Sequence, residues 1–224
     1  MKKRIVISLL LGMLAVSAAG CSGKAAEATS TAQKMAEDMS ADELLEAAEN
    51  GNGRAYTTLG NMYENGEGGV EQDYQKALKY YLLSAEAENA DFKGLRYAAL
   101  MYYNGVGVEQ DYDKAMEYFE QSADAGDISS AYYLGNMYEN GIGVEVDYSK
   151  ALSYYEMAIA KLDEYLANDK NNGPDELKEA LCALANMYEN GIGVEADQDK
   201  ADEYYGYAAE LGWDVSTNSE ADKN

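Results

Sequence analysis

The sequence predicts an all-α protein, an α/α solenoid of four helix-turn-helix repeats with a capping helix at its N-terminal end. The stretch "NMYENGIGVE" occurs at residues 136–145 and again, letter for letter, at 186–195, and near copies lie at 61–71 and 100–109. A recurrence at intervals of about 20–50 residues is typical of stacked structural repeats. The chain of 224 residues also contains a single proline, which leaves long helices uninterrupted.

The spacing of the copies gives the length of the repeated unit. Counted between the first glycines of the copies, the intervals are 39, 36 and 50 residues (Gly66, Gly105, Gly141 and Gly191). The base period is therefore near 36 residues, with one small and one large insertion. We expect the four repeats at about residues 53–89, 90–127, 128–173 and 174–213.

The first half of each unit has helical spacing and ends in a glycine turn. Leu134, Gly135 and Tyr138 stand at i, i+1 and i+4, on one face of a helix. Asn140-Gly141 accepts a positive φ, which ends the helix. A phosphate loop would need a following Lys-Ser/Thr, and a β-hairpin would need alternating strands on both sides of the turn. We therefore interpret the glycines as a structural corner.

The second half of each unit begins with Asp-x-x-Lys-Ala and carries an aromatic pair. Each aspartate stands where a helix N-cap is expected (Asp73, Asp111, Asp147 and Asp197). The aromatic pairs follow seven to eight residues later, at Tyr80-Tyr81, Tyr118-Phe119, Tyr154-Tyr155 and Tyr204-Tyr205. A small residue in each first helix, at Gly60, Ala99, Gly135 and Ala185, is expected to let the two helices approach closely.

The ends of the array and the third repeat differ from this pattern. Ser40-Ala41-Asp42-Glu43 is a capping box, which predicts a helix that ends at Gly51 and covers the first repeat. In the third repeat we expect an elongated second helix, a loop at 168–173, and a new helix with Pro174 in its first turn. The polar tail 214–224 is expected to be disordered.

The amino terminus has the layout of a bacterial export signal. Residues 1–20 begin with Lys2, Lys3 and Arg4, continue with an apolar run from Ile5 to Val16, and end in small residues. This run is too short to span a bilayer, which requires about 20 residues. The polar segment 21–39 that follows is predicted to be a flexible tether.

The last letters of this signal, Ala18-Ala19-Gly20-Cys21, resemble a bacterial lipobox. That resemblance implies cleavage before Cys21 and lipidation of its thiol and its new amine. We then expect an extracytoplasmic protein with a lipid anchor in the bacterial cell membrane or outer membrane. The alternative is cleavage after Ala19 by an ordinary signal peptidase, which would give a freely secreted protein.

The repeated residues resemble those of the Sel1-like repeat family, a relative of the tetratricopeptide repeats. In the third unit the matching residues are Leu134-Gly135, Tyr138, Gly141-x-Gly143-Val144, Asp147-x-x-Lys150-Ala151, Tyr155 and Ala158. The resemblance covers about residues 41–213. It implies stacked helix pairs whose first helices line a concave groove that binds a protein or peptide.

The candidate groove residues are the positions of each first helix that lie away from the partner helix. They are Thr57, Asn61 and Glu64; Arg96, Leu100 and Tyr103; Tyr132, Asn136 and Glu139; and Cys182, Asn186 and Glu189. Asparagine recurs at the central position in three of the four repeats, where its amide could hold an extended peptide backbone. Alternatively, these asparagines accompany the duplicated sequence and have no binding role.

Composition argues against several classes of function. The net charge is −24, or −27 without the first twenty residues (14 basic against 41 acidic side chains), which disfavours nucleic acid as a partner. The chain has no histidine, so we expect no imidazole base, and we identify no catalytic residue, metal site or cofactor. Once Cys21 is lipidated, Cys182 is the only cysteine left, and its apolar neighbours favour burial over a reactive role.

These observations predict a non-enzymatic, membrane-anchored scaffold or adaptor that binds a protein or peptide. One alternative is a hydrolase that acts on cell-wall or β-lactam compounds. A cysteine-rich branch of the Sel1-like family has been linked to β-lactam hydrolysis, but this chain lacks the paired cysteines of that branch. The other alternative is a regulator that binds the extracytoplasmic domain of a membrane sensor.

Overall fold

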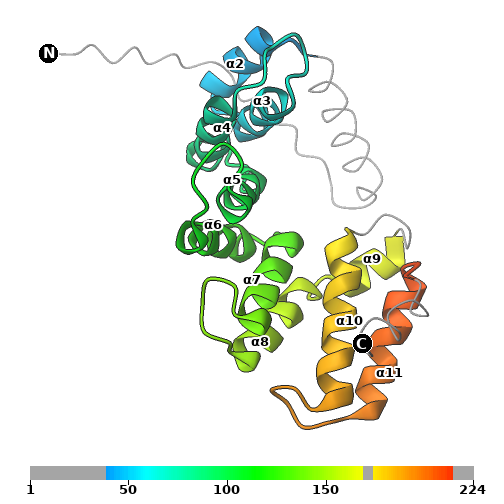
Figure 1. Cartoon of the computed structure of the whole chain (residues 1–224). Helices are drawn as coiled ribbons and strands as arrows, with labels where there is room; N and C mark the ends of the chain where they lie inside the picture. The colour runs from blue at the N-terminus through cyan, green and yellow to red at the C-terminus, as the bar shows by residue number, and fades with distance from the viewer. Residues whose placement is uncertain (1–38, 169–173, 214–224) are drawn as a thin grey trace, which may run out of the picture. The chain divides into compact units, whose positions relative to one another are not determined.

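Four pairs of antiparallel helices follow one another along the chain in the computed structural model, which describes residues 39–168 and 174–213 (Figure 1). The pairs are α3 (Gly53–Asn65) with α4 (Tyr74–Glu86), α5 (Lys93–Asn104) with α6 (Tyr112–Asp124), α7 (Ile128–Asn140) with α8 (Tyr148–Ala158), and α10 (Asp175–Asn190) with α11 (Gln198–Glu210). Successive pairs are in contact, through α4 with α5, α6 with α7, and α8 with α10. The predicted all-α solenoid of four repeats is confirmed.

The predicted capping helix is also present, as α2 (Ala41–Glu49). Its capping box is complete, because the Glu43 amide donates to Ser40 Oγ at 3.4 Å and the Ser40 amide donates to Glu43 Oε2 at 2.8 Å. Helix α2 packs against α3, and its buried residues are Leu44 and Ala48. The first repeat is thus covered as expected for a helical array.

Each first helix ends at a glycine in the left-handed conformation. Gly66, Gly105, Gly141 and Gly191 have φ between 67° and 70°, and each donates its amide to the carbonyl of the methionine four residues earlier. Each second helix then begins at its aspartate, which accepts a hydrogen bond from the lysine amide three residues on, as Asp147 does from Lys150 at 3.0 Å. The glycine corners are therefore turns, as the sequence predicts.

Close helix approach within a repeat depends on the small residue of the first helix. A Cβ atom on Gly60 would lie 2.3 Å from Cε1 of Tyr81, and one on Gly135 would lie 2.6 Å from Cδ1 of Tyr155. Both tyrosine rings are almost fully buried. The rings therefore lie flat against the backbone of the first helix, where a side chain would displace them.

The second glycine of the corner contacts the preceding repeat in the second, third and fourth repeats. Gly143 has φ of +72°, and a Cβ atom there would lie 2.2 Å from Cβ of Tyr112 in the preceding repeat. The same relation holds between Gly107 and Tyr74 and between Gly193 and Tyr148. Between the first two repeats, Gln75 Nε2 also donates to the Gly107 carbonyl at 2.5 Å. The corner thus sets the stacking of one repeat on the next.

The third repeat departs from the expected elongated second helix. The helix ends at Ala158, the chain turns at 159–161, and a separate short helix α9 (Leu162–Asn168) follows. Within the turn the Leu162 amide donates to the Ile159 carbonyl at 2.8 Å, and Leu162 is buried. We infer that burial of this leucine favours the break. Pro174 was expected in the first turn of the new helix and stands at the N-cap of α10, immediately before that turn.

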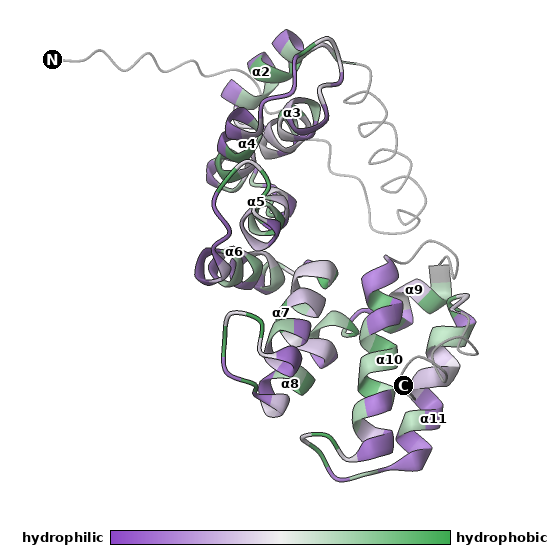
Figure 2. Ribbon diagram, in the orientation of Figure 1, coloured by the Kyte–Doolittle hydropathy of each residue, from purple (hydrophilic) through white to green (hydrophobic). Residues whose placement is uncertain are grey.

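Each helix carries both hydrophobic and hydrophilic positions, as Figure 2 shows, and the apolar ones supply the core between paired helices. None of the helices in the described residues is long and apolar enough to cross a membrane. The predicted signal 1–20, the tail 214–224, most of the tether 21–39 and most of the loop 168–173 lie outside the described residues.

Candidate functional site

The first helices of the repeats carry the predicted groove residues. Helix α3 contacts α5, and α7 contacts α10. Ten of the twelve candidate side chains are at least partly exposed, whereas Thr57 and Cys182 are buried, with 6% and 9% of their surfaces exposed. The twelve predicted residues thus lie on helices α3, α5, α7 and α10. Their role in binding stays a prediction.

The recurring glutamate of this face is held by a tyrosine of the second helix. Tyr155 donates its hydroxyl to Glu139 Oε2 at 2.6 Å, and Tyr205 donates to Glu189 Oε2 at 3.2 Å. In the first repeat the Tyr81 hydroxyl contacts both Glu64 Oε2 and Asn61 Oδ1, the latter at 2.8 Å. Burial and the neighbouring carboxylate raise the pKa of Tyr81 and of Tyr155, so both hydroxyls stay protonated donors.

The second repeat changes all members of this contact together. It has Leu100 in place of the asparagine, Tyr103 in place of the glutamate and Phe119 in place of the tyrosine. Phe119 has no hydroxyl to donate, and its ring instead meets the Tyr103 ring edge-on, with centroids 6.3 Å apart. This joint change is visible in the sequence. It indicates that the recurring glutamates are kept by their contact with the tyrosine of the second helix, without the need for a ligand.

A second repeated contact was not predicted from the sequence. In it a lysine lies over one tyrosine ring, and that ring packs against a second tyrosine. In the third repeat Lys150 Nζ lies 4.6 Å from the centroid of the Tyr138 ring, and the Tyr138 and Tyr154 rings stack with centroids 5.7 Å apart. The other repeats repeat the arrangement with Lys76, Tyr63 and Tyr80, with Lys114, Tyr102 and Tyr118, and with Lys200, Tyr188 and Tyr204. A cation over an aromatic face stabilises each helix pair.

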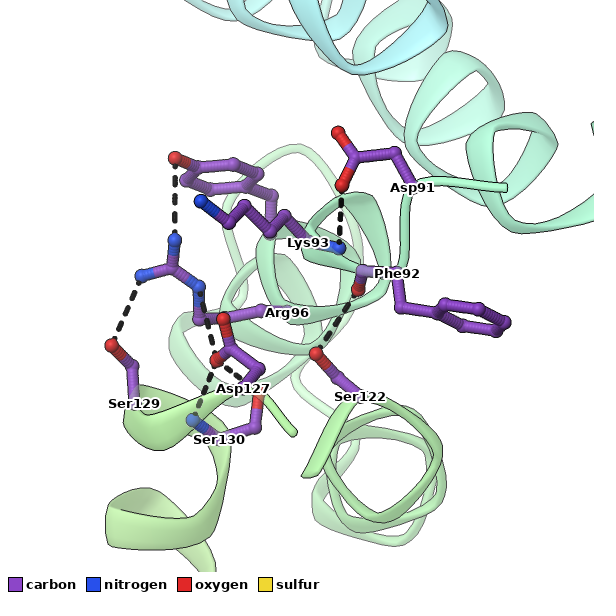
Figure 3. Close-up of polar contacts among 9 residues, drawn as sticks. Asp91, Phe92, Lys93, Arg96, Ser122, Asp127, Ser129 and Ser130 are labelled. Atoms are coloured by element: carbon purple, nitrogen blue, oxygen red, sulfur yellow. Dashed lines mark hydrogen bonds and ion pairs between the residues drawn. The ribbon is translucent and has the colours of Figure 1, made fainter. Parts of the chain in front are cut away.

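Arg96 joins the second and third repeats through polar contacts (Figure 3). Its Nε lies 3.4 Å from Oδ1 of Asp127, its Nη1 donates to Ser129 Oγ at 3.3 Å, and its guanidinium lies over the Tyr97 ring. Asp127 is the N-cap of α7 and also accepts from the Ser130 amide at 2.9 Å. The arginine of the second repeat is thus attached to the first turn of the third.

A cleft of about 780 Å³ opens beside Arg96. It lies at the N-terminal ends of α5, α7 and α10 and is also lined by the 159–161 turn and α9 through Lys161 and Tyr165. This cleft was not predicted from the sequence, because it is formed by segments that are far apart in the chain.

The reactive groups near this face are poorly suited to acid–base or nucleophilic chemistry. Burial raises the pKa of the Cys182 thiol to about 11, so little thiolate is present at neutral pH. Burial and Glu179 likewise raise the pKa of Tyr132. In residues 39–168 and 174–213 no group of three or more Cys, Asp or Glu side chains is placed to hold a metal ion.

Comparison with protein families finds one match, to the model of the Sel1 repeat. It matches four times, at residues 54–89, 94–127, 128–161 and 178–213, and so covers more than half of the chain. None of the curated proteins compared with the chain matches it.

Two solved structures of the same fold have 28% sequence identity to this chain. A Sel1 repeat protein from Oxalobacter formigenes aligns with a TM-score of 0.66 over 80% of this chain and 67% of its own. A protective antigen of uropathogenic Escherichia coli strains, which displays an SLR fold, aligns with a TM-score of 0.67 over 79% of this chain. This chain spans about a third, 34%, of that antigen.

Proposed function

Because the chain belongs to the Sel1 repeat family, we propose that it is a non-catalytic scaffold that binds a protein or peptide along its first helices. The face consists of exposed positions of α3, α5, α7 and α10, and the cleft beside Arg96 continues it. An array of equivalent helices offers an extended partner one contact after another.

One observation carries this proposal: the internal contacts repeat, whereas the first groove position does not. The aspartate cap, the lysine over its tyrosine and the glycine turn recur in all four repeats. The equivalent groove position is Thr57, Arg96, Tyr132 and Cys182 in turn, of which Arg96 and Tyr132 are partly exposed and Thr57 and Cys182 are buried. A constant frame that presents different side chains in the two middle repeats suits recognition of an irregular partner.

A photo-crosslinking residue placed at single positions in the bacterium of origin tests the scaffold. We expect Tyr103 and Tyr132, on α5 and α7, to give a crosslink to the same protein partner. Glu117 and Met157, exposed on the second helices α6 and α8, serve as matched controls and are expected to give none. Crosslinks of equal yield from both pairs of positions, or none from the first pair, would contradict the proposal.

We further propose that the scaffold is held outside the cytoplasm by a lipid anchor on Cys21. The support is the arrangement of basic, apolar and small residues in 1–20 followed by cysteine. Mass spectrometry of the mature amino terminus is expected to find an acylated Cys21, and Cys21→Ala is expected to move the protein from the membrane to the soluble fraction. An unmodified mature terminus at Gly20 or Cys21 would refute the anchor.

A further inference from the structure

The cleft beside Arg96 is lined by three of the few basic side chains of a very acidic chain, together with four carboxylates. Of the ten lysine and arginine side chains in the described residues, four lie over tyrosine rings next to their own capping aspartates. Lys178 pairs with Asp175 at 2.9 Å. Three of the remaining five, Lys93, Arg96 and Lys161, line this one cleft.

Lys93 and Arg96 are two positive charges close together on one helix, and an anion bound between them would reduce their mutual repulsion. They stand three residues apart on α5, and Figure 3 shows both side chains extending to the same side of that helix. Like charges at this spacing destabilise a helix. Lys161 reaches the cleft from the 159–161 turn, where its Nζ would lie 3.2 Å from a Cβ atom on Gly126 of the α6–α7 turn.

The guanidinium of Arg96 is only loosely satisfied by its present neighbours. Its contacts to Asp127 Oδ1, Ser129 Oγ and the Tyr97 hydroxyl measure 3.4, 3.3 and 3.4 Å, at the outer limit of hydrogen bonding. Its Nε is buried and lies 3.4 Å from Asp127 Oδ1 without forming a regular hydrogen bond, and the side chain as a whole is 18% exposed. A planar guanidinium whose Nη groups make only long contacts is suited to donate them to a carboxylate.

The acidic side chains of the cleft are mostly engaged with the protein itself. Asp127 caps α7 and faces Arg96, and Asp175 accepts from Lys178 Nζ. Asp91 Oδ1 accepts from the Lys93 amide at 3.3 Å. The remaining carboxylate in the lining is Glu176. The amino groups of Lys93 and Lys161 and the weakly bound Nη groups of Arg96 are therefore the positive charges best placed to meet a ligand.

We propose that this cleft binds an aspartate or glutamate side chain of an extended peptide partner, with Arg96 and Lys93 as its contacts. Lys161 contributes a third positive charge from the 159–161 turn. A volume of about 780 Å³ takes more than a single acidic side chain, so neighbouring peptide residues also enter. This binding mode rests on the proposed peptide-binding function, for which it supplies the partner's chemistry.

Fluorescence anisotropy of labelled, C-terminally amidated peptides of about ten residues tests this binding mode, since such a peptide extends over about 30 Å. The full-length chain is titrated into a Glu-Gly peptide, and into Gln-Gly and Lys-Gly peptides of the same length. The ionic strength is about 0.15 M, where screening over about 8 Å suppresses the repulsion by the whole acidic chain but leaves contacts in the cleft. We expect saturable binding of the Glu peptide and much weaker binding of the Gln peptide.

The matched variants separate the cleft from the overall charge. Lys93→Gln/Lys161→Gln removes two positive charges from the cleft, and Arg54→Gln/Lys79→Gln removes two positive charges elsewhere on α3 and α4. We expect at least about a fivefold loss of affinity in the first double variant and less than about twofold in the second. Arg96→Lys keeps the charge but loses the planar fork, and is expected to weaken binding while circular dichroism reports a folded chain.

Several results would overturn the proposal. They are equal losses in the two double variants, equal binding of the Glu and Gln peptides, and no saturable binding of the Glu peptide. Binding of the Lys peptide alone would leave the peptide-binding scaffold standing and refute the acidic partner. A Gln peptide with a free terminal carboxylate that binds as tightly as the Glu peptide would assign the cleft to a chain terminus and refute the side-chain contact.

Discussion

Tyr155 of α8 donates its hydroxyl to Glu139 of α7 at 2.6 Å, so that the two helices of the third repeat are joined through a buried ring. The Tyr155 ring occupies the space left by the missing side chain of Gly135. The Tyr155 hydroxyl therefore holds the Glu139 carboxylate in place on the groove face. The packing of the two helices determines the position of that carboxylate.

Tyr155→Phe is expected to lower the free energy of unfolding by about 1.5 kcal/mol or more, because a hydrogen bond to a charged acceptor is lost from a buried site. Urea denaturation measures the change. Tyr154→Phe is the matched control, since the Tyr154 hydroxyl reaches Glu120 Oε1 only at 3.5 Å and in an exposed position. An equal loss in the two variants would show that the buried Tyr155–Glu139 contact stabilises the fold no more than the exposed Tyr154–Glu120 contact does.

The corner glycines allow a test of the contact between repeats. Gly143→Ala forces a positive φ on alanine, at about 1 kcal/mol, and also places a methyl group 2.2 Å from Tyr112 Cβ. Gly69→Ala imposes a similar positive φ, but nothing lies within 4 Å of its Cβ. Thermal unfolding is expected to show a clearly larger loss for Gly143→Ala, and comparable losses would mean that the loop yields without disturbing the stacking.

The aspartate caps should make stability depend on acid pH. The hydrogen bond from the Lys114 amide, followed by the Lys114 side chain, lowers the pKa of Asp111 in the folded protein. A lowered folded pKa stabilises the fold above the unfolded pKa of about 4, and this contribution is lost as pH falls through the folded value.

Asp111→Asn keeps a capping oxygen but removes the charge. We expect the wild type to be the more stable at pH 7 and the difference to vanish as the pH falls below about 4, as measured by urea midpoints. Asp113→Asn, next along the helix and exposed, controls for the loss of one negative charge. A difference that persists unchanged at low pH would mean that the Asp111 charge has no role.

Tyrosine ionisation should limit stability at the alkaline end. Burial, and secondarily Glu120, raises the pKa of Tyr154 to about 12, and burial also raises the pKa of Tyr80 and of Tyr118. Because the unfolded tyrosines ionise near pH 10, the stabilisation is fully present below that value and is lost as pH rises toward the folded pKa values. Tyrosinate absorbance and helical circular dichroism are expected to change together above about pH 10, and ionisation well before unfolding would contradict this.

Local signals account for the parts of the fold that the sequence predicts correctly. Asn140-Gly141 and Asp147 mark a helix end and a helix start through the conformations of their own residues, and both work as expected. The turn after Ala158 was missed because the helical pattern continues through it. Whether Leu162 reaches the core depends on the neighbouring repeat and has no local signal.

The candidate site was less predictable for the same reason. The Tyr155–Glu139 contact and its equivalents join residues 16 or 17 positions apart, and the joint change to Phe119 and Tyr103 could have revealed it. Arg96 and Asp127 meet only because the second and third repeats stack at a particular distance. Such a distance between repeats is a property of packing and is absent from the pattern within one unit.

Cys182 provides the last prediction. Its apolar neighbours predicted burial, which is confirmed, and that burial raises the pKa of its thiol to about 11. In a Cys21→Ser background, where Cys182 is the only thiol, we expect slow reaction with a disulfide reagent at pH 8, since the thiolate is the reacting form. In urea the reaction is expected to become fast, because unfolding exposes the Cys182 thiol and returns its pKa to the ordinary value near 8.5. Fast, complete reaction of the folded chain at pH 8 would contradict the burial and would make Cys182 an accessible member of the groove.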